Sequence, residues 1–153
     1  MASHLRTQLR DAVSTALSTL PPSAGDVHPY RVWPIDPASL PLVAVHTPGD
    51  EATRASPEAD PDDPETIERV VDLRVTGYAT GAEATLDATL DAVSREVELL
   101  LAAGVSIGGK IVKLDYQGAV LTYEGGDQPY GSVQMRWFAE LVHTADAPDV
   151  LIA

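Results

Sequence analysis

Residues 68–104 constrain the fold most, because a two-residue hydrophobic period changes there into a helical one. In the first part, the apolar side chains of Val71, Leu73 and Val75 alternate with polar ones, which is typical of a strand with one buried face. In the second part, apolar residues recur at steps of three and four, as on one stripe of a helix: Leu86, Leu90, Val93, Val97, Leu100 and Leu101. The segment therefore predicts a strand followed by a long amphipathic helix.

Local signals mark both ends of this helix. Thr80-Gly81-Ala82-Glu83 fits a capping box, in which the Thr80 hydroxyl accepts an amide of the first turn and the Glu83 carboxylate reaches back. Gly104 is the expected C-terminal stop. We expect the helix to run from about Ala82 to Ala103.

Periodicity elsewhere predicts one more helix and several strands. Apolar residues from Leu5 to Leu20 follow one helical stripe, with Ser3 as the candidate cap and Pro21-Pro22 as the stop. Strands or extended segments are expected at Val27–Trp33, Leu42–Thr47, Lys110–Tyr116, Ala119–Glu124 and Ser132–His143. This order predicts an α+β fold, with one mixed, largely antiparallel β-sheet covered by two α-helices in a single domain over residues 1–153.

An acidic, proline-rich segment interrupts these elements at residues 48–66. It contains seven acidic residues, four prolines and few apolar side chains, so we expect a long, mobile loop. The last residues, 144–153, are expected to form a tail whose apolar end either packs on a neighbouring subunit, extends a sheet edge, or frays.

The overall charge limits the partners. The formal net charge is −13 and the isoelectric point is about 4.4, which argues against sequence-independent binding of nucleic acid or anionic membranes. Without cysteine, the chain has no disulfide, thiolate metal site or cysteine nucleophile. The sequence has no apolar run of about 20 residues, so no membrane span is predicted. The N-terminus does not resemble a secretory signal, so we expect synthesis in the cytoplasm.

Two local motifs have partial matches to ligand-binding loops. The spacing of Gly104–Lys110 is that of a phosphate loop, but Ile111 replaces the Ser or Thr that holds magnesium, and the segment leads from helix to strand. The acidic run Asp60–Glu65 has no EF-hand glycine or distant glutamate, so a solvated loop is the better interpretation.

Other chemical groups are dispersed. The four histidines lie far apart in the sequence, with no spacing typical of metal ligands. Asp87 and Asp91 on the predicted helix are more typical of a solvent-exposed face than of acid–base catalysis. We therefore predict no catalytic residue, no metal site and no cofactor, and we expect the protein not to be an enzyme.

Residues that face outward from the predicted strands, and the apolar C-terminus, are candidates for a subunit interface. The alternative for the charged ones is solvent exposure or cross-strand pairing. Phe138 lies opposite Trp137, which the alternation assigns to the core. The candidate interface residues are Arg69, Arg74, Arg136, Phe138, Val150, Leu151 and Ile152.

Taken together, these segments resemble the tail terminator family of long-tailed bacteriophages, also called tail completion or minor tail protein U-like proteins. The resemblance covers most of the chain except residues 48–66, and it lies in the order and local pattern of segments. They are LRTQLRDAVSTAL (5–17), VWPIDPASLPLVAVHTP (32–48), RVVDLRVTGYATG (69–81), ATLDATLDAVSREVELLL (84–101) and GSVQMRWFAELVHTADAPD (131–149).

The resemblance implies a structural virion protein at the tail–neck junction. Members of the family form a sixfold ring on the finished tail tube, stop its growth and face the head–neck connector or stopper protein. The expected partners are therefore further copies of the chain, the tail tube protein and the connector, with DNA passing through unbound and no membrane involved. Alternatives are another ring component of the tail or neck, such as a tube or stopper protein, or a small-ligand-binding domain.

Charge adds a hypothesis about the ring. Six chains of −13 would sum to about −78, and acidic loops lining the bore would repel the DNA backbone. The residues expected to face this lumen are Asp50, Glu51, Glu58, Asp60, Asp62, Asp63 and Glu65.

Overall fold

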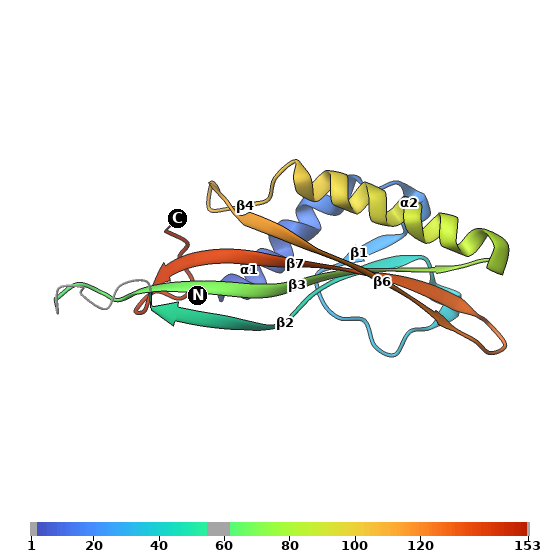
Figure 1. Ribbon diagram of the computed structural model, residues 1–153, viewed down its shortest axis with the longest axis horizontal. Coiled ribbons are helices and arrows are strands. Elements are labelled where there is room, and N and C mark those ends of the chain that lie inside the picture. Colours follow the sequence, from blue (N-terminus) through green and yellow to red (C-terminus); the bar gives the residue numbers. More distant parts are fainter. Residues whose placement is uncertain (1–2, 55–61, 153) are drawn as a thin grey trace.

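A computed structural model describes residues 3–54 and 62–152 and has both α-helices on one face of a twisted five-stranded sheet (Figure 1). The helices are α1 (Leu5–Ala16) and α2 (Glu83–Ala102), with short 3₁₀ turns at Leu17–Thr19, Pro22–Ala24 and Pro37–Ser39. The strands are β1 (Asp26–His28), β2 (Leu42–Arg54), β3 (Thr66–Thr80), β4 (Ser106–Ile107), β5 (Lys110–Ile111), β6 (Lys113–Glu124) and β7 (Tyr130–Thr144). The predicted α+β class is confirmed.

The main sheet has the strand order β1-β2-β3-β7-β6. Only β1 and β2 are parallel, so the sheet is mixed and largely antiparallel, as predicted. β4 and β5 form a separate two-stranded hairpin. In Figure 1 the helices lie above the main sheet and the segment between β1 and β2 passes below it. We call the face without helices the open face.

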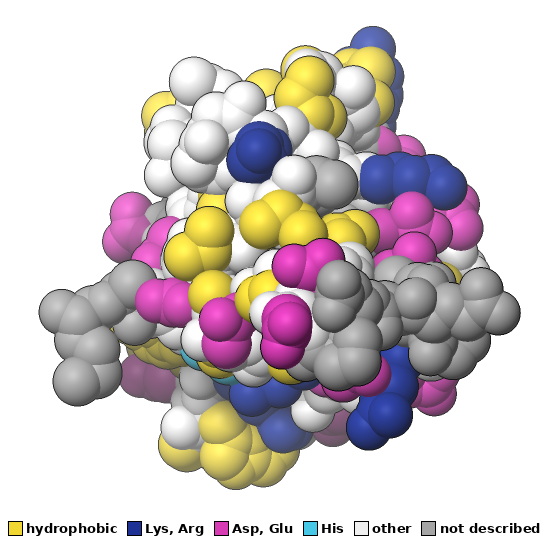
Figure 2. All heavy atoms as spheres, turned by 90° about the vertical axis from the view of Figure 1, so that its left-hand side faces the viewer, with side chains coloured by type: hydrophobic (Ala, Val, Ile, Leu, Met, Phe, Trp, Pro, Cys, Tyr) yellow, Lys and Arg dark blue, Asp and Glu magenta, His cyan; other side chains and the backbone are white. Residues whose placement is uncertain are grey.

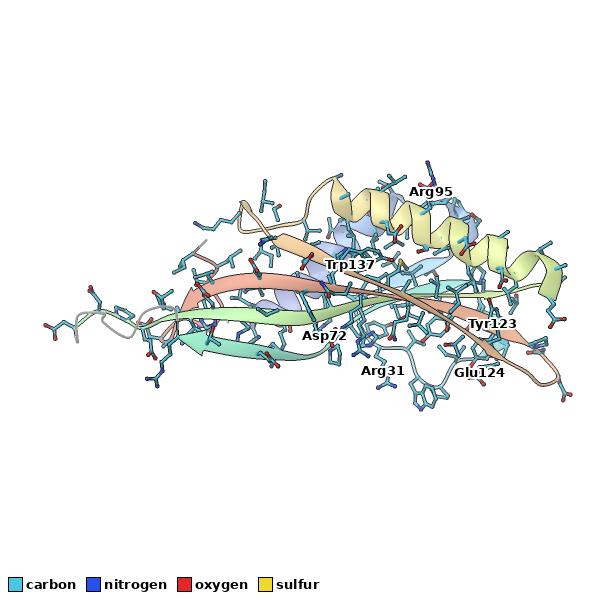
Figure 3. The ribbon with its side chains drawn as sticks, viewed as in Figure 1. Arg31, Asp72, Arg95, Tyr123, Glu124 and Trp137 are labelled. Atoms are coloured by element: carbon cyan, nitrogen blue, oxygen red, sulfur yellow. The ribbon has the colours of Figure 1, made fainter. Side chains whose placement is uncertain are left out.

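Alternation along β7 produces the main part of the core. Its buried residues occupy every second position, from Val133 through Leu141, and face the stripe of α2. Trp137 is 5% exposed and lies between sheet and helices, as its place in the alternation predicts (Figure 3). Burial of each large apolar side chain contributes about 1.5–3 kcal/mol, so the shared interface of sheet and helices dominates stability.

Two glycines allow α2 to approach the sheet closely. A Cβ atom at Gly77 would lie 2.9 Å from Val93 Cγ1, and one at Gly131 would lie 3.0 Å from Leu86 Cδ2. Since Cβ contacts under about 3.4 Å are rare, larger residues at these positions would push the helix away.

The predicted capping box is wrong. Thr80 is the last residue of β3, and the N-cap of α2 is Ala82, whose side chain cannot accept a hydrogen bond. Glu83 still places a negative charge in the first turn, where it interacts favourably with the helix dipole. At α1 the N-cap is His4 rather than Ser3, and its Nδ1 accepts the backbone N–H of Arg6 at 3.1 Å.

The predicted bounds of the acidic loop, 48–66, are also wrong. β2 continues through Arg54 and pairs with β3 from Ile67 onward, so Asp50 and Glu51 are strand residues. Ladder hydrogen bonds and cross-strand ion pairs stabilise this hairpin despite its acidic composition. Glu58 and Asp60 lie outside the described residues.

Three further boundaries differ from the prediction. The helix predicted to Leu20 changes at Leu17 into a 3₁₀ turn, and β1 ends at His28 before the prolines. The predicted strands 110–116 and 119–124 are instead β5 and one long strand β6 with an irregularity between Tyr116 and Gly118. Neither α1 nor α2, judged on the described part of the chain, combines the length and apolarity of a membrane-crossing helix.

Candidate assembly surfaces

A charged cluster lies on the open face, at the centre of the sheet. Asp72 on β3 accepts a hydrogen bond from Arg74 Nη2 at 3.0 Å and another from Arg136 Nε on β7 at 3.0 Å. Burial by itself would raise the pKa of Asp72, but its hydrogen bonds to Arg74 and Arg136 and their charges outweigh burial and lower it. The Asp72 label in Figure 3 lies on the side away from the helices.

Phe138 belongs to the same cluster. The Arg136 guanidinium lies 4.9 Å from the centroid of the Phe138 ring, a cation–π distance. A hollow of about 340 Å³ beside them is lined by Gly49, Asp50, Glu51, Val70, Asp72, Arg136 and Phe138. The structure thus brings together three of the predicted interface residues, Arg74, Arg136 and Phe138, on one surface with charged and apolar parts.

Arg69 lies in a different cluster near the start of α1. Asp50 accepts Arg69 Nη1 at 2.6 Å and also pairs with Arg6, and its side chain is only 8% exposed. His143, which is 2% exposed, accepts Arg69 Nε at 3.2 Å and donates from Nδ1 to the Thr144 carbonyl. Burial alone would raise the pKa of Asp50, but the hydrogen bond from Arg6 and the charge of Arg69 lower it overall.

This arrangement separates Asp50 from the other acidic residues predicted to face a lumen. Asp50 is largely buried, and two arginines compensate its charge. The side chains of Glu51, Asp62 and Asp63 are exposed to solvent. Glu65 accepts Arg54 Nε at 2.9 Å in an exposed ion pair.

Two edges of the sheet are open along much of their length. Within the described residues, β6 pairs only with β7, and β2 is covered by β1 only along Leu42–Ala44. The side chains of β6 are exposed on both faces, including Tyr116 (42%), Val120 (65%), Leu121 (38%) and Tyr123 (51%). A long apolar edge strand is a template for pairing with another chain. Sequence analysis missed this edge, although apolar residues on both faces of 119–123 are a signal for it.

The C-terminal segment packs on its own chain. Leu151 is 6% exposed and belongs to the core. The backbone N–H of Ile152 donates to the carbonyl of Val142 on β7 at 2.9 Å, just past Glu140, which pairs with the first residue of β6. Val150 (50%) and Ile152 (41%) remain exposed. Figure 2 views this end of the molecule and shows hydrophobic side chains gathered between acidic ones. The tail therefore packs on its own chain, and residues 150–152 form no strand at the sheet edge.

The end of the molecule near the start of α2 contains an open groove of about 520 Å³. It is lined in part by Glu83, Asp87, Tyr123 and Glu124, and the Tyr123 hydroxyl donates to Asp87. Figure 3 shows Tyr123 and Glu124 close together on β6. No group of three His, Asp or Glu side chains among residues 3–54 and 62–152 is placed to hold a metal ion.

Comparison with known proteins gives a structural match without a sequence match. No family model and no curated protein matches the chain. The chain is similar to one in a solved structure described as the virion of a native gene transfer agent particle, with a TM-score of 0.62 and 15% sequence identity. The match covers 88% of this chain and 95% of the other. At this identity, the likeness shows a shared fold.

Proposed function

We propose that the protein is a structural virion component that forms a closed, sixfold ring on the end of a tail tube, stops its elongation and joins it to the head–neck connector. The observation that carries this proposal is the fold match, which extends over nearly the whole of both chains, to a component of a phage-like particle. The order of segments that resembles tail terminators gives the finer assignment to the tail–neck junction.

The two sheet edges support a ring. β2, β3, β7 and β6 alternate in direction, so the free edge of β6 can pair antiparallel with the uncovered part of β2 in the next subunit. Such a contact joins two different surfaces and is therefore heterologous, and a heterologous contact closes into a ring when the rotation per subunit fits. The exposed apolar residues of β6 would be covered in this arrangement.

Charge supports passage of DNA without binding. Each chain contributes a net charge of −13, and the exposed Glu51, Asp62 and Asp63 would be the lumen-facing residues near the β2–β3 connection. A bore of this sign repels phosphates. Asp50 is removed from the proposed set because its charge is compensated within the chain.

A tube or stopper protein is the second candidate, because open sheet edges suit any ring component. A ligand-binding domain would use the groove beside Tyr123, but several of its lining residues, including Glu83 and Asp87, are exposed, unlike those of pockets that enclose small ligands.

Tube assembly in the presence of the purified chain distinguishes these functions. Tail tube protein of the same particle is polymerised with increasing amounts of the chain, and tube lengths and ends are recorded by electron microscopy. A terminator shortens tubes and forms a ring at one end. Self-polymerisation of the chain into tubes would instead support a tube protein, and unchanged tubes with bare ends would contradict the proposed role.

A further inference from the structure

A basic hollow lies at the β2 edge of the sheet. It has a volume of about 300 Å³ and is lined by Arg10 of α1, Tyr30 and Arg31 of the segment after β1, and His46, Thr47 and Pro48 of β2. It begins where β1 no longer covers β2. Figure 3 shows Arg31 below the sheet, on the side of the open face.

The arginines of this hollow differ from the other basic side chains. Seven of the ten Lys and Arg residues form ion pairs within the described chain. Arg10 instead donates to the hydroxyls of Thr47 and Thr7, at 2.7 and 3.1 Å, and the Arg31 guanidinium lies 5.8 Å from the Trp33 ring. In a chain of net charge −13, two guanidiniums without a described carboxylate partner meet in one place.

His46 adds an unsatisfied polar atom. Its Nδ1 is buried and has no hydrogen-bond partner among the residues that the structure describes. Burial, Arg74 and Arg31 lower the pKa of His46, while Asp72 opposes them. Asp72 is already engaged by Arg74 and Arg136, so it does not serve as the carboxylate partner of Arg31.

A protein carboxylate fits this hollow better than DNA does. A DNA backbone presents a series of phosphates and requires basic side chains along a track. Here the basic residues occupy one small hollow, and the chain as a whole carries a net charge of −13. A guanidinium pair in a confined site is suited to a single carboxylate.

Strand register relates the hollow to a carboxylate on the opposite edge of the sheet. His46 lies in one row with Arg74, Arg136 and Gly118, and Gly49 lies in one row with Asp72, Phe138 and Asp115. Asp115 is therefore at the height of the hollow, on β6, and on the same open face as Phe138. It is exposed and forms no ion pair within the described residues.

We infer that the hollow at the β2 edge receives the carboxylate of Asp115 from a second copy of this chain, with Arg31 as its main partner. This inference rests on the proposed ring. When β6 of one subunit adjoins β2 of the next with the strands nearly parallel to the ring axis, equal rows meet and Asp115 comes beside Gly49, next to residues 46–48 of the hollow. The ion pair then fixes the register of the contact between subunits.

A charge exchange tests the pair. Ring formation is measured by native mass spectrometry and sedimentation for the wild type, Arg31→Glu, Asp115→Arg and the double variant. Arg95→Glu is the matched control, because Arg95 lies on the exposed side of α2 and, within residues 3–54 and 62–152, forms an ion pair only with its neighbour Glu96. Circular dichroism confirms that each variant is folded. Each single variant is expected to weaken assembly at least about tenfold relative to Arg95→Glu, and the double variant to recover most of the loss.

The outcomes separate this inference from the proposed function. A wild-type ring with single variants that behave like Arg95→Glu, or with no recovery in the double variant, overturns the Arg31–Asp115 pair and leaves the ring intact. A wild type that forms no ring, alone or on tail tubes, overturns both. If Arg31→Glu instead abolishes binding to a fluorescent DNA duplex, the anion is a phosphate and the inference is wrong.

Discussion

At the scale of single residues, the two carboxylates Asp50 and Asp72 connect parts of the chain that are distant in sequence. Asp50 joins α1 to β2 and β3 through Arg6 and Arg69, and Asp72 joins β3 to β7 through Arg136. Breaking a largely buried ion pair leaves the remaining charge without compensation, so its removal costs more than loss of an exposed pair. Asp50 and Asp72 therefore contribute to the stability of the fold as well as to the charged surface.

Asp50→Asn is expected to lower the free energy of unfolding by about 2 kcal/mol, because Asn cannot compensate the Arg69 guanidinium, whose side chain is 15% exposed. Glu65→Gln is the matched control, since its partner Arg54 is 75% exposed, and the expected change is under about 0.5 kcal/mol. Urea unfolding at neutral pH measures both. Equal losses in the two variants would contradict the assigned role of Asp50.

Stability is expected to fall in acid. The pKa values of Asp50 and Asp72 are lowered from 3.8 in the folded chain, so the unfolded chain binds protons first as the pH decreases. Their contribution is complete above the unfolded pKa and is lost as the pH falls through the folded pKa. Urea midpoints measured from about pH 7 to pH 3 should decline less in Asp50→Asn/Asp72→Asn than in the wild type. If the urea midpoints of the variant and the wild type fall equally with pH, the lowered pKa values of Asp50 and Asp72 would be contradicted.

At the scale of elements, sequence periodicity predicts the parts whose burial is one-sided. β7 and α2 each have one buried face and were predicted within a few residues. β6 is exposed on both faces, so no alternation distinguishes its bounds, and the hairpin of β2 and β3 depends on pairings such as Asp50 with Arg69, which lie 19 residues apart. The sequence pattern predicts that residues such as Arg74 and Arg136 face outward, but it does not predict that they form a cluster. Asp72 and Arg136 come together only through the register of β3 with β7.

The C-terminal segment is expected to stabilise the monomer. Leu151→Ala should lower the free energy of unfolding by about 2–4 kcal/mol, because Leu151 is 6% exposed in the core. Val150→Ala, at a position that is 50% exposed, is the control and should cost under about 0.5 kcal/mol. Chemical denaturation of the two variants compares them directly. A Leu151→Ala variant as stable as Val150→Ala would show that the tail does not pack on its own chain.

The N-terminus of α2 lacks a capping side chain, so a substitution there can stabilise the helix. Ala82 has the extended backbone of an N-cap (φ −67°, ψ 143°) but no capping hydrogen bond, so Ala82→Ser is expected to stabilise the protein by about 0.5–1 kcal/mol. Ala84→Ser places the same side chain two positions after the N-cap, at the second residue of the helix, where no stabilisation is expected. Thermal unfolding monitored by circular dichroism should rank Ala82→Ser above the wild type and Ala84→Ser at or below it. The reverse order would contradict the assigned helix start.

At the scale of the whole molecule, the placement of both helices on one face leaves the two sheet edges and the open face for contacts between copies. The two unequal edges, β2 and β6, suit the heterologous contact of the proposed ring. Net charge opposes that assembly, since each chain carries −13, so counterions should assist it.

Native mass spectrometry of the purified chain, over a range of concentrations and with and without magnesium, tests the ring most directly. We predict a hexamer that forms cooperatively and more readily when magnesium reduces the repulsion between subunits. A dimer that persists at every concentration would contradict the ring, because pairing of β6 with β2 of the next subunit leaves a free edge at each end of a dimer and would add further subunits.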